Sequence, residues 1–126
     1  MVRSLLLTLL LTIPLSAEDK IKALDALTIR VSPKMSVRAP ASVRLEFRQT
    51  RHPDNRKLFI EMTCEGLTVW STTRQLHGAA TPPQHPPVYL EKLGPCRYEI
   101  KGLLYRMVEG ELRVADRRTE VFLVWG

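Results

Sequence analysis

The stretch "CRYEIKGLL" (residues 96–104) alternates apolar and polar side chains, and its apolar positions are Cys96, Tyr98, Ile100 and Leu104. Successive side chains of an extended strand point to opposite faces, so this spacing predicts a strand with one buried and one solvated face. Half-buried strands of this kind are typical of antiparallel sheets. The stretch therefore predicts an all-β fold.

Other parts of the chain repeat this pattern. Clear alternation occurs in "LTIRVS" (27–32), "SVRLEFRQT" (42–50) and "LFIEMTCE" (58–65). Shorter strand-like runs are "LTVWS" (67–71) and "VYLEKL" (88–93). Each of these runs is bounded by residues that favour turns, so each predicts a further strand.

The segments between the runs carry turn signals. "RHPDNR" (51–56) is a polar turn, and "LHGAATPPQHPP" (76–87) is a proline-rich loop. "VEGEL" (108–112) has a central glycine, which indicates a hairpin. The last run, "LRVADRRTEVFLVW" (112–125), is interrupted near 116–118, where we expect a bulge or bend.

Together these segments predict an antiparallel two-sheet immunoglobulin-like sandwich of about seven strands, and a small closed barrel is the alternative.

The first residues, "MVRSLLLTLLLTIPLSA" (1–17), have the basic start, short apolar run and small final residues of a secretory signal peptide. That apolar run is shorter than the roughly 20 residues of a membrane-spanning helix. We therefore expect a signal peptide at 1–17, an N-terminal lead at 18–26 and the sandwich at 27–126. No transmembrane segment is expected after cleavage.

The charge of the chain limits its partners. The chain has 126 residues and a formal net charge of +6. A basic surface attracts nucleic acid, anionic lipid or acidic polysaccharide. The charges are mixed along the strands, however, because Glu46 lies between Arg44 and Arg48. This mixture indicates first a solvated sheet face and second a binding patch, and export argues against nucleic acid.

Several segments together resemble an immunoglobulin-like or fibronectin type III-like sandwich of secreted bacterial proteins. They are "VSP…APASVRLEF", "NRKLFIEM", "LEKLGPCRYEIKG" and "TEVFLVW", all within residues 27–126. Such domains often open a strand with L-x-x-G-x-Y-x-I/V, with the tyrosine at a corner near the start of the penultimate strand. Tyr98 and Ile100 match that spacing, and Cys96 stands where glycine is usual. The resemblance implies a sandwich with Tyr98 at a corner, and it implies no particular activity.

The two cysteines of the chain are placed by this topology. Cys64 ends the predicted third strand and Cys96 begins the sixth, and in an immunoglobulin-like sandwich these strands are antiparallel neighbours in one sheet. Both cysteines also fall in the inward register of their strands. In an exported protein such a pair predicts a disulfide. Two buried free thiols are one alternative, and a reactive or metal-binding cysteine is another, which the wide spacing and the lack of a nearby histidine disfavour.

No catalytic constellation, phosphate-binding loop or close-spaced metal-ligand pair is present in the sequence. We therefore expect no enzyme, no cofactor and no metal. The histidines, His52, His77 and His85, all fall in predicted loops, where exposure to water is the default. A metal site made by His77 and His85 is the alternative.

The predicted binding surface combines the two loops with neighbouring strand residues. In the turn at 51–56, we expect Asp54 or Asn55 to fix the backbone, and the alternative is that the turn displays Arg51, His52 and Arg56 for binding at one end of the sandwich. Trp70 is off the register of Leu67 and Val69, so ligand contact is an alternative to core packing. The full set is Arg51, His52, Arg56, Trp70, Arg74, His77 and His85.

We therefore expect a secreted or periplasmic, non-enzymatic β-sandwich module that binds an envelope or extracellular protein or polysaccharide. One alternative is a small metal-dependent hydrolase with its site at the 76–87 loop. Another is a basic module that docks on acidic polysaccharide or anionic lipid.

Overall fold

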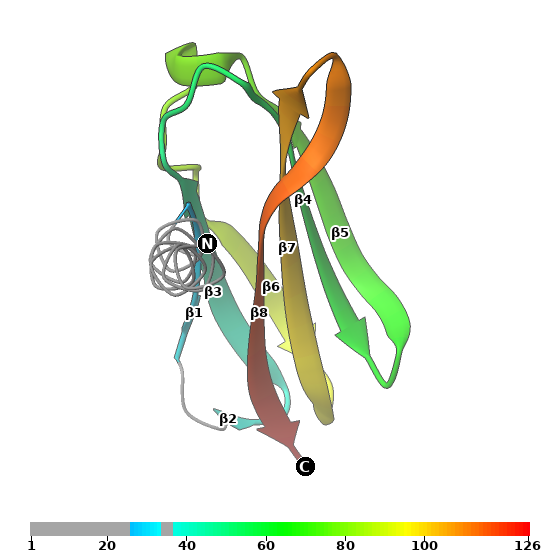
Figure 1. Ribbon diagram of the computed structural model, residues 1–126. Helices are drawn as coiled ribbons and strands as arrows, with labels where there is room; N and C mark the ends of the chain where they lie inside the picture. The colour runs from blue at the N-terminus through cyan, green and yellow to red at the C-terminus, as the bar shows by residue number, and fades with distance from the viewer. Residues whose placement is uncertain (1–25, 34–36) are drawn as a thin grey trace, which may run out of the picture.

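The computed structural model describes residues 26–33 and 37–126, which form two β-sheets packed face to face (Figure 1). The smaller sheet has the order β1-β3-β6, with β1 at Leu27–Ser32, β3 at Ala41–Gln49 and β6 at Val88–Leu93. The larger sheet has the order β2-β8-β7-β4-β5. Its strands are β2 (Val37–Arg38), β4 (Asn55–Cys64), β5 (Leu67–Gln75), β7 (Cys96–Val108) and β8 (Glu111–Trp125). A short 3-10 helix, η1 (Gly78–Ala80), lies in the loop after β5.

The prediction of an all-β two-sheet fold is confirmed, and one part of it is wrong. The larger sheet is mixed, because β2 pairs parallel with the end of β8 through Val37 opposite Val124 and Arg38 opposite Trp125. A two-residue strand has too few positions to show alternation, and alternation says nothing of a partner's direction. The other neighbouring strands pair antiparallel, as predicted.

A single core lies between the sheets and is built from the alternating positions. Buried and exposed residues alternate along β1 and through most of β3. The fully buried side chains include Leu27, Leu45, Phe47, Leu58, Ile60, Met62, Ile100 and Leu104. Gly102 lets β7 approach β1 closely, since a Cβ there would lie 2.7 Å from Cδ1 of Ile29.

One side of the sandwich is closed by hydrogen bonds from β8 to β1. The Leu27 N–H donates to Oδ2 of Asp116 at 2.9 Å, and Nε of Arg118 donates to the Leu27 carbonyl at 2.9 Å. The predicted bulge lies here: Leu104 faces Asp116, while Tyr105 faces Val114, so Ala115 is an extra residue. This bulge precedes the buried carboxylate that faces β1.

The predicted disulfide is confirmed between Cys64 and Cys96, with their Cα atoms 6.1 Å apart. It joins the end of β4 to the start of β7 within one sheet, where Cys64 lies opposite Tyr98. The Tyr98 hydroxyl donates to the Gly94 carbonyl at 2.8 Å, which makes Tyr98 the expected corner residue. At the other end of the same strand pair, Nε of Arg106 donates to Oδ1 of buried Asn55 at 2.8 Å.

The predicted signal peptide at 1–17 and most of the lead at 18–26 lie outside the described residues. Within the described part of the chain, no helix is long and apolar enough to cross a membrane.

Candidate functional site

The two loops that the sequence predicted as a binding surface lie together at one end of the sandwich (Figure 1). Nη1 of Arg51 donates to the Ala79 carbonyl at 2.8 Å, which ties the turn at 51–56 to η1. Gly78 lies against Pro53 with a φ of +60°, and a Cβ at this glycine would lie 2.5 Å from the Pro53 carbonyl oxygen. A side chain larger than hydrogen would therefore separate the loops.

Most polar side chains of this loop end stabilise the turn. Nδ1 of His52 accepts a hydrogen bond from the Asp54 N–H at 3.0 Å. Nη1 of Arg56 donates to the carbonyls of Pro53 and Asn55 at 2.8 and 2.9 Å. His77 is exposed beside a shallow hollow lined by Pro53, Arg56, Leu76, His77, Gly78 and Ala79. The loops thus bring Arg51, His52, Arg56 and His77 together.

His85 corrects the expectation that the loop histidines are exposed, because it is only 7 % exposed. Its ring stacks on Phe47 with 5.0 Å between centroids, and Nε2 pairs with Oε1 of Gln49. The Gln49 amide nitrogen donates to the Pro82 carbonyl at 3.2 Å, so its oxygen faces His85 and Nε2 of His85 is the donor. The 76–87 loop is thereby fixed to the core.

Two other predicted surface residues also lie against the core. Trp70 is half-buried and packs on the core, which is the favoured role of the two that the sequence left open. The guanidinium of Arg74 lies 5.6 Å from the centre of the Phe47 ring. Its Nε is buried and has no hydrogen-bond partner in the described residues.

The pKa of His85 is lowered from its usual 6.5, first by burial and second by the positive charge of Arg74. The neutral imidazole is therefore the favoured form in the folded protein. No three His, Cys, Asp or Glu side chains gather as a metal-ligand group within residues 26–33 and 37–126.

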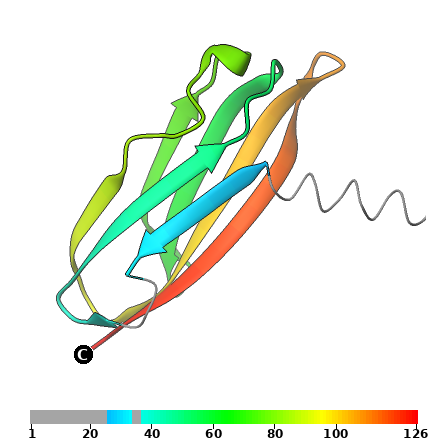
Figure 2. The same ribbon diagram turned by 90° about the vertical axis from the view of Figure 1, so that its left-hand side faces the viewer.

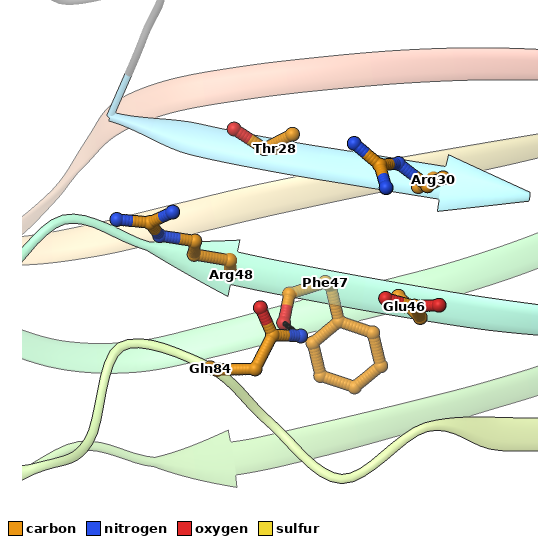
Figure 3. Close-up of a pocket in the computed structure, with 6 residues that line it drawn as sticks. All are labelled: Thr28, Arg30, Glu46, Phe47, Arg48 and Gln84. Atoms are coloured by element: carbon orange, nitrogen blue, oxygen red, sulfur yellow. Dashed lines mark hydrogen bonds between the residues drawn. The ribbon is translucent and has the colours of Figure 1, made fainter.

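A second site lies on the outer face of the smaller sheet, which faces the viewer in Figure 2. Here β1 and β3 place Thr28 opposite Arg48 and Arg30 opposite Glu46. A hollow of about 250 Å³ opens between them, and Figure 3 shows the side chains around it. We call this hollow the arginine cleft; it is lined by Thr28, Arg30, Glu46, Phe47, Arg48 and Gln84.

In the arginine cleft the acidic side chain forms an ion pair, whereas two basic side chains do not. Glu46 forms an ion pair with Arg44, whose Nε lies 3.1 Å from the carboxylate. Arg30 and Arg48 are exposed, and no ion pair or hydrogen bond holds either guanidinium in the part of the chain that the structure describes. The Gln84 amide nitrogen lies 3.5 Å from the Phe47 carbonyl oxygen, a long hydrogen bond. The cleft therefore offers two unpaired cationic groups for an anion.

An exposed aromatic ring lies on the same face. Tyr89 of β6 is directly opposite Arg44 of β3 and is 65 % exposed. The face thus combines guanidinium groups, a hydroxyl, an amide and an aromatic ring.

The predicted site residues did not include this cleft. The sequence showed the arginines at outward positions of two strands, but only the β1–β3 register places Arg30 and Arg48 around one hollow. The sequence did contain a signal for the cleft: the outward positions of 27–32 and 42–50 hold more arginine residues than acidic residues.

Comparison with known proteins shows the fold. The chain is similar to the superoxide reductase (neelaredoxin) from Ignicoccus hospitalis, with a TM-score of 0.56 and 13 % identity over 79 % of this chain and 80 % of that one. It is also similar to the sulfur carrier protein SoxY from Chlorobium limicola f thiosulfatophilum, with a TM-score of 0.53 and 15 % identity over 79 % of this chain and 78 % of that one. No family model matches the chain, and no curated protein matches it.

The prediction that the protein is not an enzyme is contradicted by these neighbours, because a superoxide reductase shares the fold. The physical reason is that a sandwich imposes no chemistry of its own. Its loops and strand ends bring together side chains that are far apart in the sequence, so a missing local motif does not exclude an active site.

Proposed function

We propose that this protein is an exported module of the bacterial secreted immunoglobulin-like or fibronectin type III-like type, and that it binds an acidic polysaccharide at the arginine cleft. The observation that supports the proposal is the pair of unpartnered, exposed guanidinium groups of Arg30 and Arg48 on either side of one hollow. Each guanidinium can form two parallel hydrogen bonds with a carboxylate or a sulfate group.

The rest of this face suits a sugar chain. The Thr28 hydroxyl and the Gln84 amide line the hollow and can bond sugar hydroxyl groups. The exposed Tyr89 ring on the same sheet face offers an apolar surface for a sugar ring. Thr28 and Tyr89 lie on strands of this sheet, and Gln84 lies in the adjoining loop at a backbone bridge to Arg48 of β3, so the sheet sets the spacing of all three groups.

Two further properties support an extracellular or periplasmic ligand. The Cys64–Cys96 disulfide is compatible with an oxidising compartment. The net charge of +6 attracts a polyanion over a distance and raises the rate of encounter.

The test measures binding of the purified protein to polygalacturonate, dextran sulfate and uncharged dextran at several salt concentrations. The double variant Arg30→Gln, Arg48→Gln is expected to bind the two polyanions at least about tenfold more weakly, which corresponds to 1.4 kcal/mol. The matched control is Arg97→Gln, Lys101→Gln, which removes two exposed charges from the outer face of β7. This control should change binding much less.

Equal losses in the two double variants would contradict the cleft and indicate attraction by net charge alone. Binding that does not weaken with salt would contradict the charge mechanism, since exposed charges are screened. Binding to vesicles that contain anionic lipid, together with no binding to either polyanion, would replace polysaccharide with a membrane surface.

A further inference from the structure

The outer face of the smaller sheet continues beyond the arginine cleft toward β6. Residues that lie opposite one another form rows across this face, and successive rows are about 7 Å apart, because every second residue of a strand shares a face. The first row holds Thr28, Arg48 and Gln84, the second holds Arg30 and Glu46, and the third holds Ser32, Arg44 and Tyr89. The first two rows line the cleft together with Phe47, so the third row lies beside it.

The third row offers no free positive charge to an anion. Its one charged side chain is Arg44, because Ser32 and Tyr89 are uncharged. Nε of Arg44 lies 3.1 Å from Oε1 of Glu46 in the second row, so an ion pair balances its charge. The side chain of Glu46 is still 25 % exposed, and its carboxylate can therefore repel an anionic group brought to this part of the face.

The exposed residues of β6 do not change this balance. Glu91 and Lys92 follow Tyr89, both are exposed, and their opposite charges offset each other. The Tyr89 ring is 65 % exposed and presents a flat apolar surface. The β6 end of the face is therefore suited to an uncharged sugar ring, whereas the cleft end is suited to an anionic group.

The two ends of this face are too far apart to contact one sugar residue. Arg30 and Tyr89 are separated by two strand spacings across the sheet and by two residues along the strands. This offset places their backbones roughly 12 Å apart in a regular sheet. Figure 3 shows that Glu46 and Arg48 lie at opposite ends of the stretch of β3 that borders the hollow. A polymer that runs from the cleft to Tyr89 therefore passes Glu46.

We propose that the arginine cleft and Tyr89 are two subsites of different specificity, and that Glu46 determines this specificity. The cleft takes an acidic sugar residue, and Tyr89 takes an uncharged one. The substrate class, which rests on the proposed function, is therefore a polysaccharide in which uncharged residues separate the acidic ones. A polymer with an acidic group on every residue is disfavoured.

Glu46 discriminates through repulsion. A fully charged polymer that places one carboxylate at Arg30 and Arg48 must bring further carboxylates past Glu46, where Arg44 is already paired. Like charges brought together at a binding surface oppose the wrong partner, and binding proteins use such repulsion to gain specificity. A polymer with an uncharged residue at this position avoids the repulsion and packs its ring on Tyr89.

The test compares two polymers with one backbone, polygalacturonate and partly methyl-esterified polygalacturonate. Calorimetric titrations are made at physiological ionic strength, which screens attraction between distant exposed charges. The wild-type protein should bind the partly esterified polymer more tightly. Glu46→Gln removes the repelling charge and frees Arg44, so it should bind the fully charged polymer at least about threefold more tightly, and the preference should be lost.

Glu111→Gln is the matched control. It removes the carboxylate of another exposed ion pair and frees Arg113, whose Nη2 lies 3.1 Å from Glu111, on β8 of the other sheet. This control should leave the preference between the two polymers unchanged. Tyr89→Ala should weaken binding of the partly esterified polymer more than binding of the fully charged one.

Tighter binding of the fully charged polymer by the wild-type protein, with Arg30 and Arg48 required, would overturn the two subsites and leave the proposed function standing. Equal effects of Glu46→Gln and Glu111→Gln on the preference would also overturn the role of Glu46. The absence of binding to both polymers would overturn the proposed function together with this specificity.

Discussion

The backbone N–H of Leu27 donates to the Asp116 carboxylate at 2.9 Å, across 89 positions of the sequence and between the two sheets. The second oxygen of that carboxylate accepts from the Arg117 N–H at 2.8 Å. Asp116 is buried, and the bond from Leu27 is shielded from water, while the bond from Arg117 is partly buried. The first strand of the domain is thus fixed to the last strand by a side chain.

Asp116→Ala should therefore lower the free energy of unfolding by about 1–3 kcal/mol, because two backbone donors lose a charged acceptor. Urea denaturation followed by tryptophan fluorescence measures the change. Glu120→Ala on the exposed part of β8 is the control and should have little effect. Equal stability of the two variants would show that the bond to Leu27 does not hold the sheets together.

Stability should decrease as the pH falls below about 6.5, because burial and Arg74 lower the pKa of His85 from that value. In this pH range the unfolded chain binds a proton at His85 and the folded chain does not, so the free energy of unfolding falls with pH. The contribution of His85 to the free energy of unfolding is complete above pH 6.5 and is lost as the pH falls through the lowered pKa of the folded state. His85→Gln should flatten this dependence, and the exposed His77→Gln should keep it. Denaturation curves of the wild-type protein and both variants, measured at several pH values, give the free energy of unfolding as a function of pH. An equal pH dependence of the two variants would contradict the role of His85.

Replacement of both cysteines, Cys64→Ala with Cys96→Ala, should cost about 3–4 kcal/mol in the chain-entropy model. The disulfide closes a loop between residues 32 positions apart, and its loss frees the unfolded chain. A reductant should lower the stability of the wild-type protein to a similar degree and should not change the double variant. Alkylation of both thiols in unfolded, unreduced protein would show that the disulfide is absent.

Tyr98→Phe should cost about 0.5–1.5 kcal/mol, since it removes the hydrogen bond to the Gly94 carbonyl and keeps the ring. The stacking of this ring on Phe122, with 5.1 Å between centroids, should remain. Tyr89→Phe makes the same chemical change at an exposed ring and should be neutral for stability. A neutral Tyr98→Phe would mean that the corner does not depend on the hydroxyl.

Alternation was enough to predict the strands that form the core. It placed 27–32 and 88–93 with the bounds that the structure gives, and it placed Cys64 and Cys96 on inward positions of neighbouring strands. Side-chain direction in a strand depends on local geometry alone, so the sequence carries it directly. The bulge near 116 was also visible, because charged residues interrupt the apolar pattern there.

The missed features depend on contacts between distant segments. His85 lies in a polar, proline-rich loop, and its burial follows from Phe47 and Gln49, more than thirty positions earlier. The arginine cleft requires the register of β1 against β3, which alternation does not specify. The short β2 requires the end of β8 as its partner.

The strand pair β4–β7 is fastened at both ends, by the disulfide at Cys64 and by the hydrogen bond between Asn55 and Arg106. Fraying of a strand pair normally starts at its ends, and here each end carries an additional link between the strands. We therefore expect local opening of the larger sheet to begin in its outer strands rather than between β4 and β7. These two strands carry core side chains on which the smaller sheet packs, so their fastening supports the sheet whose outer face holds the arginine cleft.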